Sequence, residues 1–282
     1  ALIVAVAIWA GWIVLVRATV NRAEAPLGPF DIAMLRYGVP AVLLAPVWLR
    51  CGVVPKAAGP LRVAGMVLGW GAPFALLAAT GLQQADTALF AAMVPGSMPF
   101  WLSLILVGLT GTLPRPAALA GVALIAAGAL GALALAWADG RSLAGVPWLV
   151  GASIGWASYA VAYRNAGLTP VEATAVVGFW SSLLVLPVIL SGESILWDLR
   201  APLLLREAVL QGLISGVVSV MAFAFAIRHL GAPRAAAGAA SVPVLAALGG
   251  WWWLGDPLSP AMLGLLACTV AGVALVNVTP PR

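Results

Sequence analysis

Charged residues are scarce in this sequence of 282 residues. Asp, Glu, Lys and Arg make up 8% of it, hydrophobic residues make up 63%, and the mean hydropathy is +1.08. A soluble domain carries roughly 25% charged residues. Because so few charges cannot cover a water-exposed surface, we expect lipid to surround most of the chain.

Histidine and cysteine are also nearly absent, with one and two residues. Cys51 and Cys268 lie far apart in apolar stretches, which predicts small buried hydrophobic side chains rather than a disulfide framework. The sequence has no cluster with metal-ligand spacing and no phosphate-binding loop, so we expect no cofactor. The net charge of +5 is small. It favours contact with lipid head groups over nucleic acid.

Long apolar runs fill the sequence instead. A bilayer core of about 30 Å needs about 20 apolar residues of helix. Runs of this length occupy residues 2–20, 30–49, 61–81, 87–109, 116–137, 146–164, 171–190, 207–229, 234–254 and 260–278. The connections are short and polar, which favours antiparallel neighbours. The sequence therefore predicts an all-α, polytopic membrane protein with ten transmembrane helices.

The distribution of Lys and Arg predicts the orientation. The connections on the side of the N-terminus hold more Lys and Arg than those on the other side. Because Lys and Arg concentrate in cytoplasmic loops, we expect both termini to be cytoplasmic.

The two halves of the sequence resemble each other. Trp9-Ala-Gly-Trp12 matches Trp156-Ala-Ser-Tyr159 at an offset of 147 residues. Further on the offset becomes 144, where the matching residues are Pro99 and Pro243, Gly111 and Gly255, Pro116 and Pro260, and Gly128 and Gly272.

These matches predict two copies of a five-helix unit, residues 1–137 and residues 146–282. Because each copy has an odd number of spans, the second must be inserted upside down. Such inverted repeats around a central cavity are typical of many secondary transporters.

Four segments of the second half carry a family resemblance: residues 222–237, 241–248, 254–260 and 272–275. Together they resemble an EamA repeat of the drug/metabolite transporter superfamily, and residues 31–37 and 88–99 show weaker echoes. The family usually has Gly-Glu after the fourth and ninth helices, where this chain has Gly111-Thr112 and Gly255-Asp256. The first copy thus lacks the acid.

The many tryptophans are similar to those of bacterial aromatic amino-acid exporters. The resemblance implies a transporter in a bacterial inner (plasma) membrane that exports small organic solutes by alternating access. Amino acids, including aromatic ones, are the favoured solutes. We expect the lipid bilayer and a small-molecule substrate as partners, no nucleic acid, and function as a monomer.

Ionisable residues inside spans are functional candidates because a charge there is costly. Nearly every acid lies within a turn or two of a span end, so the sequence predicts weak or no proton coupling. Arg36 is the deepest basic residue. It could reach the outer head groups by snorkelling, or it could act as a gate or as a partner for Asp31 or a substrate carboxylate.

Aromatic residues at mid-span depth are the main candidates for a solute site, since Trp usually concentrates at interfaces. They could be packing between helices, or they could line a cavity in which rings stack on flat solutes. The predicted substrate-binding residues are Trp9, Trp70, Phe74, Trp101, Trp156, Tyr159, Trp180, Phe223, Ser97 and Ser241.

Prolines interrupt several predicted spans. Proline removes a backbone hydrogen bond and kinks a helix, and the freed carbonyls are tolerated next to protein or a wet cavity. We therefore expect Pro95, Pro99 and Pro243 to act as hinges, although each could also be a static kink.

Two other functions remain as alternatives: an intramembrane enzyme and a structural membrane subunit. Residues 151–155 fit the G-x-S-x-G pattern of serine hydrolases. They lie in a predicted helix with no strand before it, and the single histidine, His229, is far along the chain. We therefore expect no enzymatic activity.

Overall fold

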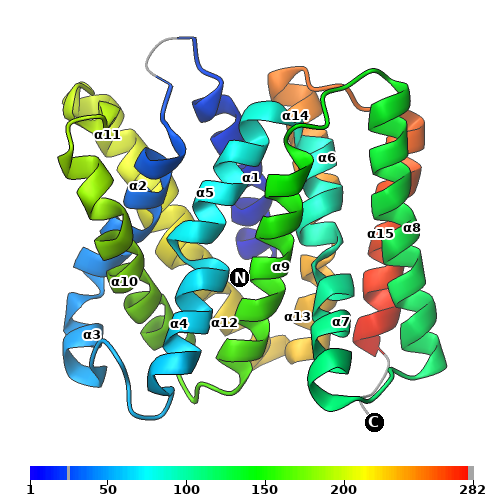
Figure 1. Ribbon diagram of the computed structural model, residues 1–282, viewed down its shortest axis with the longest axis horizontal. Helices are drawn as coiled ribbons and strands as arrows, with labels where there is room; N and C mark the ends of the chain where they lie inside the picture. The colour runs from blue at the N-terminus through cyan, green and yellow to red at the C-terminus, as the bar shows by residue number, and fades with distance from the viewer. Residues whose placement is uncertain (24–25, 279–282) are drawn as a thin grey trace.

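The computed structural model describes residues 1–23 and 26–278, and this part of the chain is helical with no strand. Long helices run roughly parallel to one another from one end of the molecule to the other (Figure 1). The prediction of an all-α polytopic protein is confirmed. Residues 279–282 of the predicted second copy lie outside the described residues.

The helices of the first half are α1 (Leu2–Val20), α2 (Pro29–Leu43), α3 (Ala45–Cys51), α4 (Gly59–Trp70), α5 (Ala72–Gln84), α6 (Thr87–Ala91), the π-helix η1 (Ala92–Gly96), α7 (Met98–Thr110) and α8 (Pro116–Ala138). Those of the second half are α9 (Val146–Arg164), α10 (Pro170–Leu190), the short 3-10 helix η2 (Ile195–Trp197), α11 (Ala201–Glu207), the π-helix η3 (Ala208–Val218), α12 (Ser219–Leu230), α13 (Ala232–Ala239), α14 (Val242–Leu254) and α15 (Pro260–Val278).

Each predicted span coincides with a helical run, but several runs are broken. Eight of them are long and apolar enough to cross a membrane, and α2 with α3 forms a further pair bent by 70°. The bend coincides with Pro46 in the first turn of α3, which has no N–H to bond back to the preceding turn. The remaining predicted span, residues 146–164, is α9. It contains several Trp, Tyr and Ser residues and is not among the eight. A count of ten spans stays a prediction.

Helices of the first half pack on helices of the second half. The pairs are α8 with α15, α2 with α10, α4 and α5 with α9, and α1 with α12 and α14. Figure 1 shows α8 and α15 side by side at one edge. Their contact depends on two glycines: a Cβ on Gly121 would lie 2.7 Å from Gly272 O, and one on Gly272 would lie 2.6 Å from Gly121 O. Small residues allow such close approach in membrane helices.

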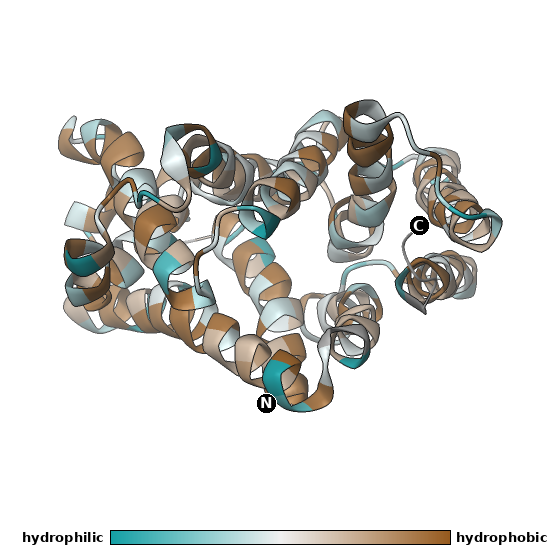
Figure 2. Cartoon of the chain, turned by 90° about the horizontal axis from the view of Figure 1, so that it is seen from below, coloured by the Kyte–Doolittle hydropathy of each residue, from teal (hydrophilic) through white to brown (hydrophobic). Residues whose placement is uncertain are grey.

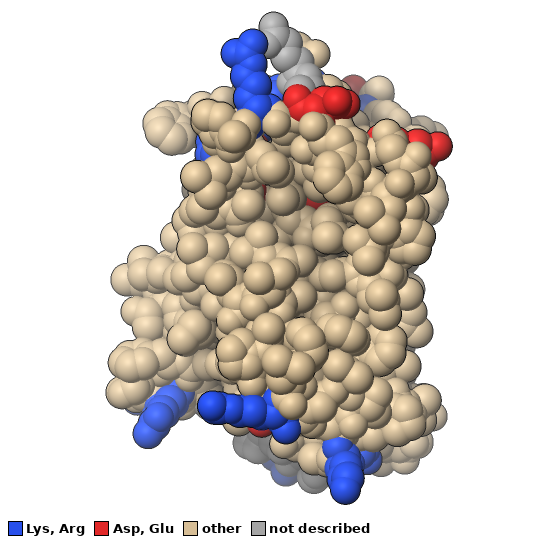
Figure 3. Space-filling model, turned by 90° about the vertical axis from the view of Figure 1, so that its left-hand side faces the viewer, with Lys and Arg blue, Asp and Glu red and all other residues tan. Residues whose placement is uncertain are grey.

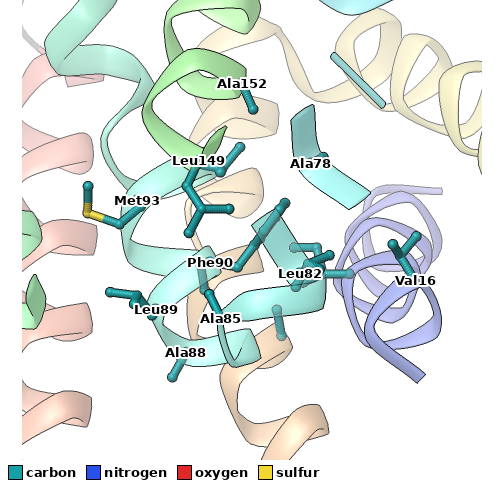
Figure 4. Close-up of a cluster of buried hydrophobic side chains, with 14 of the residues drawn as sticks. Val16, Ala78, Leu82, Ala85, Ala88, Leu89, Phe90, Met93, Leu149 and Ala152 are labelled. Carbon is teal, nitrogen blue, oxygen red and sulfur yellow. The ribbon is translucent and has the colours of Figure 1, made fainter. Parts of the chain in front are cut away.

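The largest buried cluster lies between α1, α5, α6, η1 and α9. It contains Val16, Leu82, Phe90, Met93 and Leu149. Figure 4 shows Phe90 between Leu82 and Leu149. This packing holds the two halves together around the middle of the bundle.

The outer surface is apolar. Leu61 and Trp252 are more than 80% exposed, and Figure 2 shows few hydrophilic residues on the helices. In Figure 3 the charged residues gather at the two ends and leave an uncharged band between them. This arrangement suits a bilayer, whose hydrocarbon core excludes charge.

Candidate functional site

An aromatic cavity lies in the middle of the bundle, between the two halves. Its lining residues are Trp9, Trp12, Ile13, Arg36, Trp70, Phe74, Phe90, Val94, Pro95, Trp156 and Val242. They come from α1, α2, α4, α5, α6, η1, α9 and α14. The space open to the centres of water-sized molecules measures about 30 Å³, and one water molecule needs about 10–15 Å³ on this measure.

Aromatic rings pack around Trp70 at the cavity wall in tilted arrangements. The centroid of Trp70 lies 4.3 Å from that of Phe74, 4.7 Å from that of Trp156 and 6.0 Å from that of Tyr159. A second contact joins Trp9 to Phe223 across the two halves, with centroids 4.7 Å apart. Offset and tilted arrangements of this kind are the favourable ones for aromatic pairs.

A break between α4 and α5 positions Trp70. The helix stops at Gly71 and restarts at Ala72. Backbone N–H and C=O groups at this break therefore lack partners within the helix, although they lie inside the bundle. The hydroxyl of Tyr37 donates to Trp70 O at 2.5 Å, and Ala72 N donates to the hydroxyl of Ser181 at 3.0 Å. Satisfying these groups is necessary at membrane depth, and it fixes the ring of Trp70 at the cavity wall.

The π-helix η1 carries the cavity wall past Pro95. Because proline has no N–H to donate, the regular hydrogen-bond pattern of the helix fails there. The hydroxyl of Ser97 donates to Met93 O at 2.6 Å and lies 3.0 Å from the hydroxyl of Ser153. π-turns inside helices are frequent at functional sites.

Arg36 is buried at this cavity, with 4% of its surface exposed. Its guanidinium carbon lies 4.0 Å from the centroid of Trp12 and 5.7 Å from that of Trp70. Nη1 donates to the hydroxyl of Ser215 at 2.6 Å. The snorkelling interpretation is therefore wrong, because the side chain points into the bundle and packs against the rings of Trp12 in α1 and Trp70 in α4.

Asp31 is not the partner of Arg36. Its Oδ1 accepts from the hydroxyl of Ser194 at 2.5 Å and its Oδ2 accepts from Gly28 N at 2.8 Å. The carboxylate thus caps the start of α2 and ties it to the segment before α11.

A row of buried polar residues on α11 and η3 was not found from the sequence. Glu207, Gln211 and Ser215 follow one another at intervals of four residues, and each is at most 2% exposed. Gln211 Oε1 accepts from the indole N–H of Trp12 at 2.8 Å. The row faces α1 and α2, and it orients both Trp12 and Arg36. The sequence did contain a signal for this row, because its polar residues recur every four positions within an otherwise apolar run.

Ion pairs join the two halves at the end of the bundle at which α1 ends. Arg22 Nη2 lies 2.7 Å from Glu207 Oε1, and Arg17 Nε lies 3.7 Å from Asp256 Oδ1. Both pairs join the first half of the chain to the second. At the opposite end, the described basic residues, such as Arg164 at the end of α9, form no ion pair.

The other predicted site residues lie away from the cavity lining. The ring of Trp101 meets Phe100 edge-on, and the indole N–H of Trp180 donates to Val53 O at 2.7 Å. The hydroxyl of Ser241 donates to Gly238 O at 2.7 Å. Pro99 and Pro243 occupy the first turns of α7 and α14. Their roles, like those of the lining residues, stay predictions.

The described residues hold no arrangement typical of hydrolysis. Ser153, the serine of the G-x-S-x-G pattern, is buried and its hydroxyl donates to Val94 O at 3.0 Å. His229 is exposed near the end of α12, with its ring stacked on Phe225. No group of three or more His, Cys, Asp or Glu suited to a metal ion occurs in the part of the chain that the structure covers.

Comparison with known proteins agrees with these features. The model of the EamA-like transporter family matches residues 143–278. A solved crystal structure with 20% sequence identity superposes with a TM-score of 0.61, covering 97% of this chain and 94% of the other, which shows a shared fold. No curated protein matches the sequence.

Proposed function

We propose that this chain is a secondary transporter of the EamA-like family that exports amino acids, including aromatic ones, by alternating access. The match of residues 143–278 to that family supports a multi-pass membrane transporter of small solutes. The observation that carries the proposal is the aromatic cavity between the two halves of the chain. Flat rings at van der Waals distance from one another offer a stacking surface for a flat solute.

Alternating access is supported by the difference between the two ends. Ion pairs join the halves at one end, and the space open to the centres of water-sized molecules in the middle is about 30 Å³. An amino acid needs several times the volume of a water molecule, so the cavity must widen to admit it. Separation of the two halves would widen the cavity and open one end in the same movement.

The breaks in the helices support two inverted copies, residues 1–137 and residues 146–282. The fourth predicted span is interrupted at Ser97 and the ninth at Ala240 and Ser241. Interrupted spans in corresponding positions of two repeats point to the solute site of a secondary transporter. We place both termini in the cytoplasm of a bacterial cell, with the chain acting as a monomer in the inner membrane.

Counterflow into liposomes tests the proposed function. Purified protein is reconstituted into vesicles loaded with unlabelled tryptophan, and labelled tryptophan is added outside. We expect transient accumulation of label above the level in protein-free vesicles. No accumulation of any solute across a panel of amino acids and other metabolites would contradict the proposal and favour a structural membrane subunit.

A further inference from the structure

We propose that Arg36 binds the carboxylate of the transported solute, and that the site recognises this group rather than an ammonium group. The inference rests on the proposed function and narrows its substrate class to aromatic carboxylates, with or without an amino group. The first argument is position: the guanidinium lines the aromatic cavity and is 4% exposed.

The second argument is the absence of a counter-charge. Among the described residues, Arg36 forms no ion pair, and the acids that the bundle buries are bound elsewhere: Asp31 to Ser194, Asp86 to Arg141, Glu207 to Arg22, and Asp256 to Arg17. An unpaired charge in such surroundings is energetically unfavourable. A solute that supplies a negative charge would offset this cost each time it binds.

The third argument is the number of free donors. A guanidinium has five N–H groups in a planar fork that matches a carboxylate. Among the described residues, Nη1 donates to the hydroxyl of Ser215. The hydroxyl of the neighbouring Tyr37 donates to Trp70 O and is a second acceptor for the guanidinium. The remaining donors are available to an oxygen ligand.

The rings around Arg36 define the rest of the solute. Trp12 covers one face of the guanidinium with its ring 4.0 Å away, and Gln211 holds that ring through the indole N–H. The tilted pair of Trp70 and Trp156 begins beside it. A carboxylate bound in the plane of the guanidinium would thus place an attached aromatic group against these rings.

The cavity lining offers no carboxylate to pair with an ammonium group. None of its lining residues is an acid, and Arg36 would repel a cation. An aromatic amine should therefore bind poorly, whereas an aromatic acid without the amino group should bind about as well as the amino acid.

Three probes that share an indole ring test this inference in the counterflow assay. They are tryptophan, indole-3-propionate, which lacks the amino group, and tryptamine, which lacks the carboxylate. Each competes with labelled tryptophan for the wild-type protein and for the variants Arg36→Gln and Arg36→Lys. Arg115→Gln, which removes an exposed arginine before α8, is the control.

For the wild type we expect competition by tryptophan and indole-3-propionate but not by tryptamine. Arg36→Gln should raise the half-inhibiting concentration of both acids on the order of tenfold or more, as for loss of a charged hydrogen bond. The half-inhibiting concentrations for Arg36→Lys should lie between those of the wild type and Arg36→Gln. Those for Arg115→Gln should match the wild type.

The inference would be overturned if tryptamine competed as well as tryptophan, or if Arg36→Gln left competition by the acids unchanged. The wild-type comparison needs no variant, so it decides the matter even where Arg36→Gln does not fold. Absence of all tryptophan counterflow by the wild type would refute the proposed function instead, so the two failures are distinguishable.

Discussion

Trp156 gives the sharpest test of the aromatic cavity. Its ring lies 4.7 Å from that of Trp70 and 6.2 Å from that of Phe74, and it lines the cavity. An aromatic pair contributes about 0.5–1.5 kcal/mol beyond its buried area. If a solute ring stacks on Trp156, the change Trp156→Ala should weaken binding of aromatic solutes by roughly 2- to 12-fold.

The ratio of two inhibition constants measures this effect. Phenylalanine and leucine compete with labelled solute in counterflow, and the ratio of their half-inhibiting concentrations is compared between wild type and variant. Partial loss of folded protein affects both competitors equally, so it cancels in the ratio. Trp101→Ala is the matched control, because Trp101 contacts Phe100 outside the cavity lining.

We expect the ratio to move against phenylalanine in Trp156→Ala and to stay at the wild-type value in Trp101→Ala. An equal loss for both competitors in Trp156→Ala would mean that this ring is packing and not a stacking surface. The same shift in both variants would mean that the effect is unrelated to the cavity.

Three further changes probe the closed end, the helix contacts and the break in η1. Glu207→Gln removes a fully buried carboxylate from its ion pair with Arg22; we expect faster labelling of a cysteine introduced beside it, and unchanged labelling would argue against closure by this pair. Gly69→Ala should destabilise the fold by about 1–3 kcal/mol and so lower its melting temperature in detergent, because the added Cβ would lie 2.5 Å from Gly155 O. Gly11→Ala is the control and should leave the melting temperature unchanged, because its Cβ would have no atom within 4 Å. Pro95→Ala should restore a helical hydrogen bond and slow turnover while leaving solute affinity intact; wild-type turnover would contradict a hinge there.

The positions of the helices along the sequence were predictable because lipid imposes a length on each apolar run. The predicted spans 2–20 and 146–164 coincide with α1 and α9. Proline also marked where the regular helix is interrupted, as at Pro95 in η1. The largest departures from the expected limits are the bend at Leu44 and the start of the eighth run at Ala201, six residues earlier than expected.

The faces of the helices were not predictable in the same way. A lipid-facing side and a protein-facing side are equally apolar, so the sequence could not say that Arg36 points inward. It also could not separate Trp156, which lines the cavity, from Trp180, which bonds to a loop carbonyl. Both are mid-span tryptophans, and only the packing of helices distant in sequence distinguishes them.

One helical run connects the candidate solute site to the closed end of the bundle. Glu207 binds Arg22 at that end, and Ser215 binds Arg36 at the cavity. Only seven residues lie between the two acceptors, and all of them belong to the π-helix η3. A solute carboxylate that drew Arg36 away from Ser215 would change the contacts of η3 at one point, and the same rigid segment would carry the change to the ion pair. Solute binding and opening can then be coupled through one helix without a chain of intermediate residues.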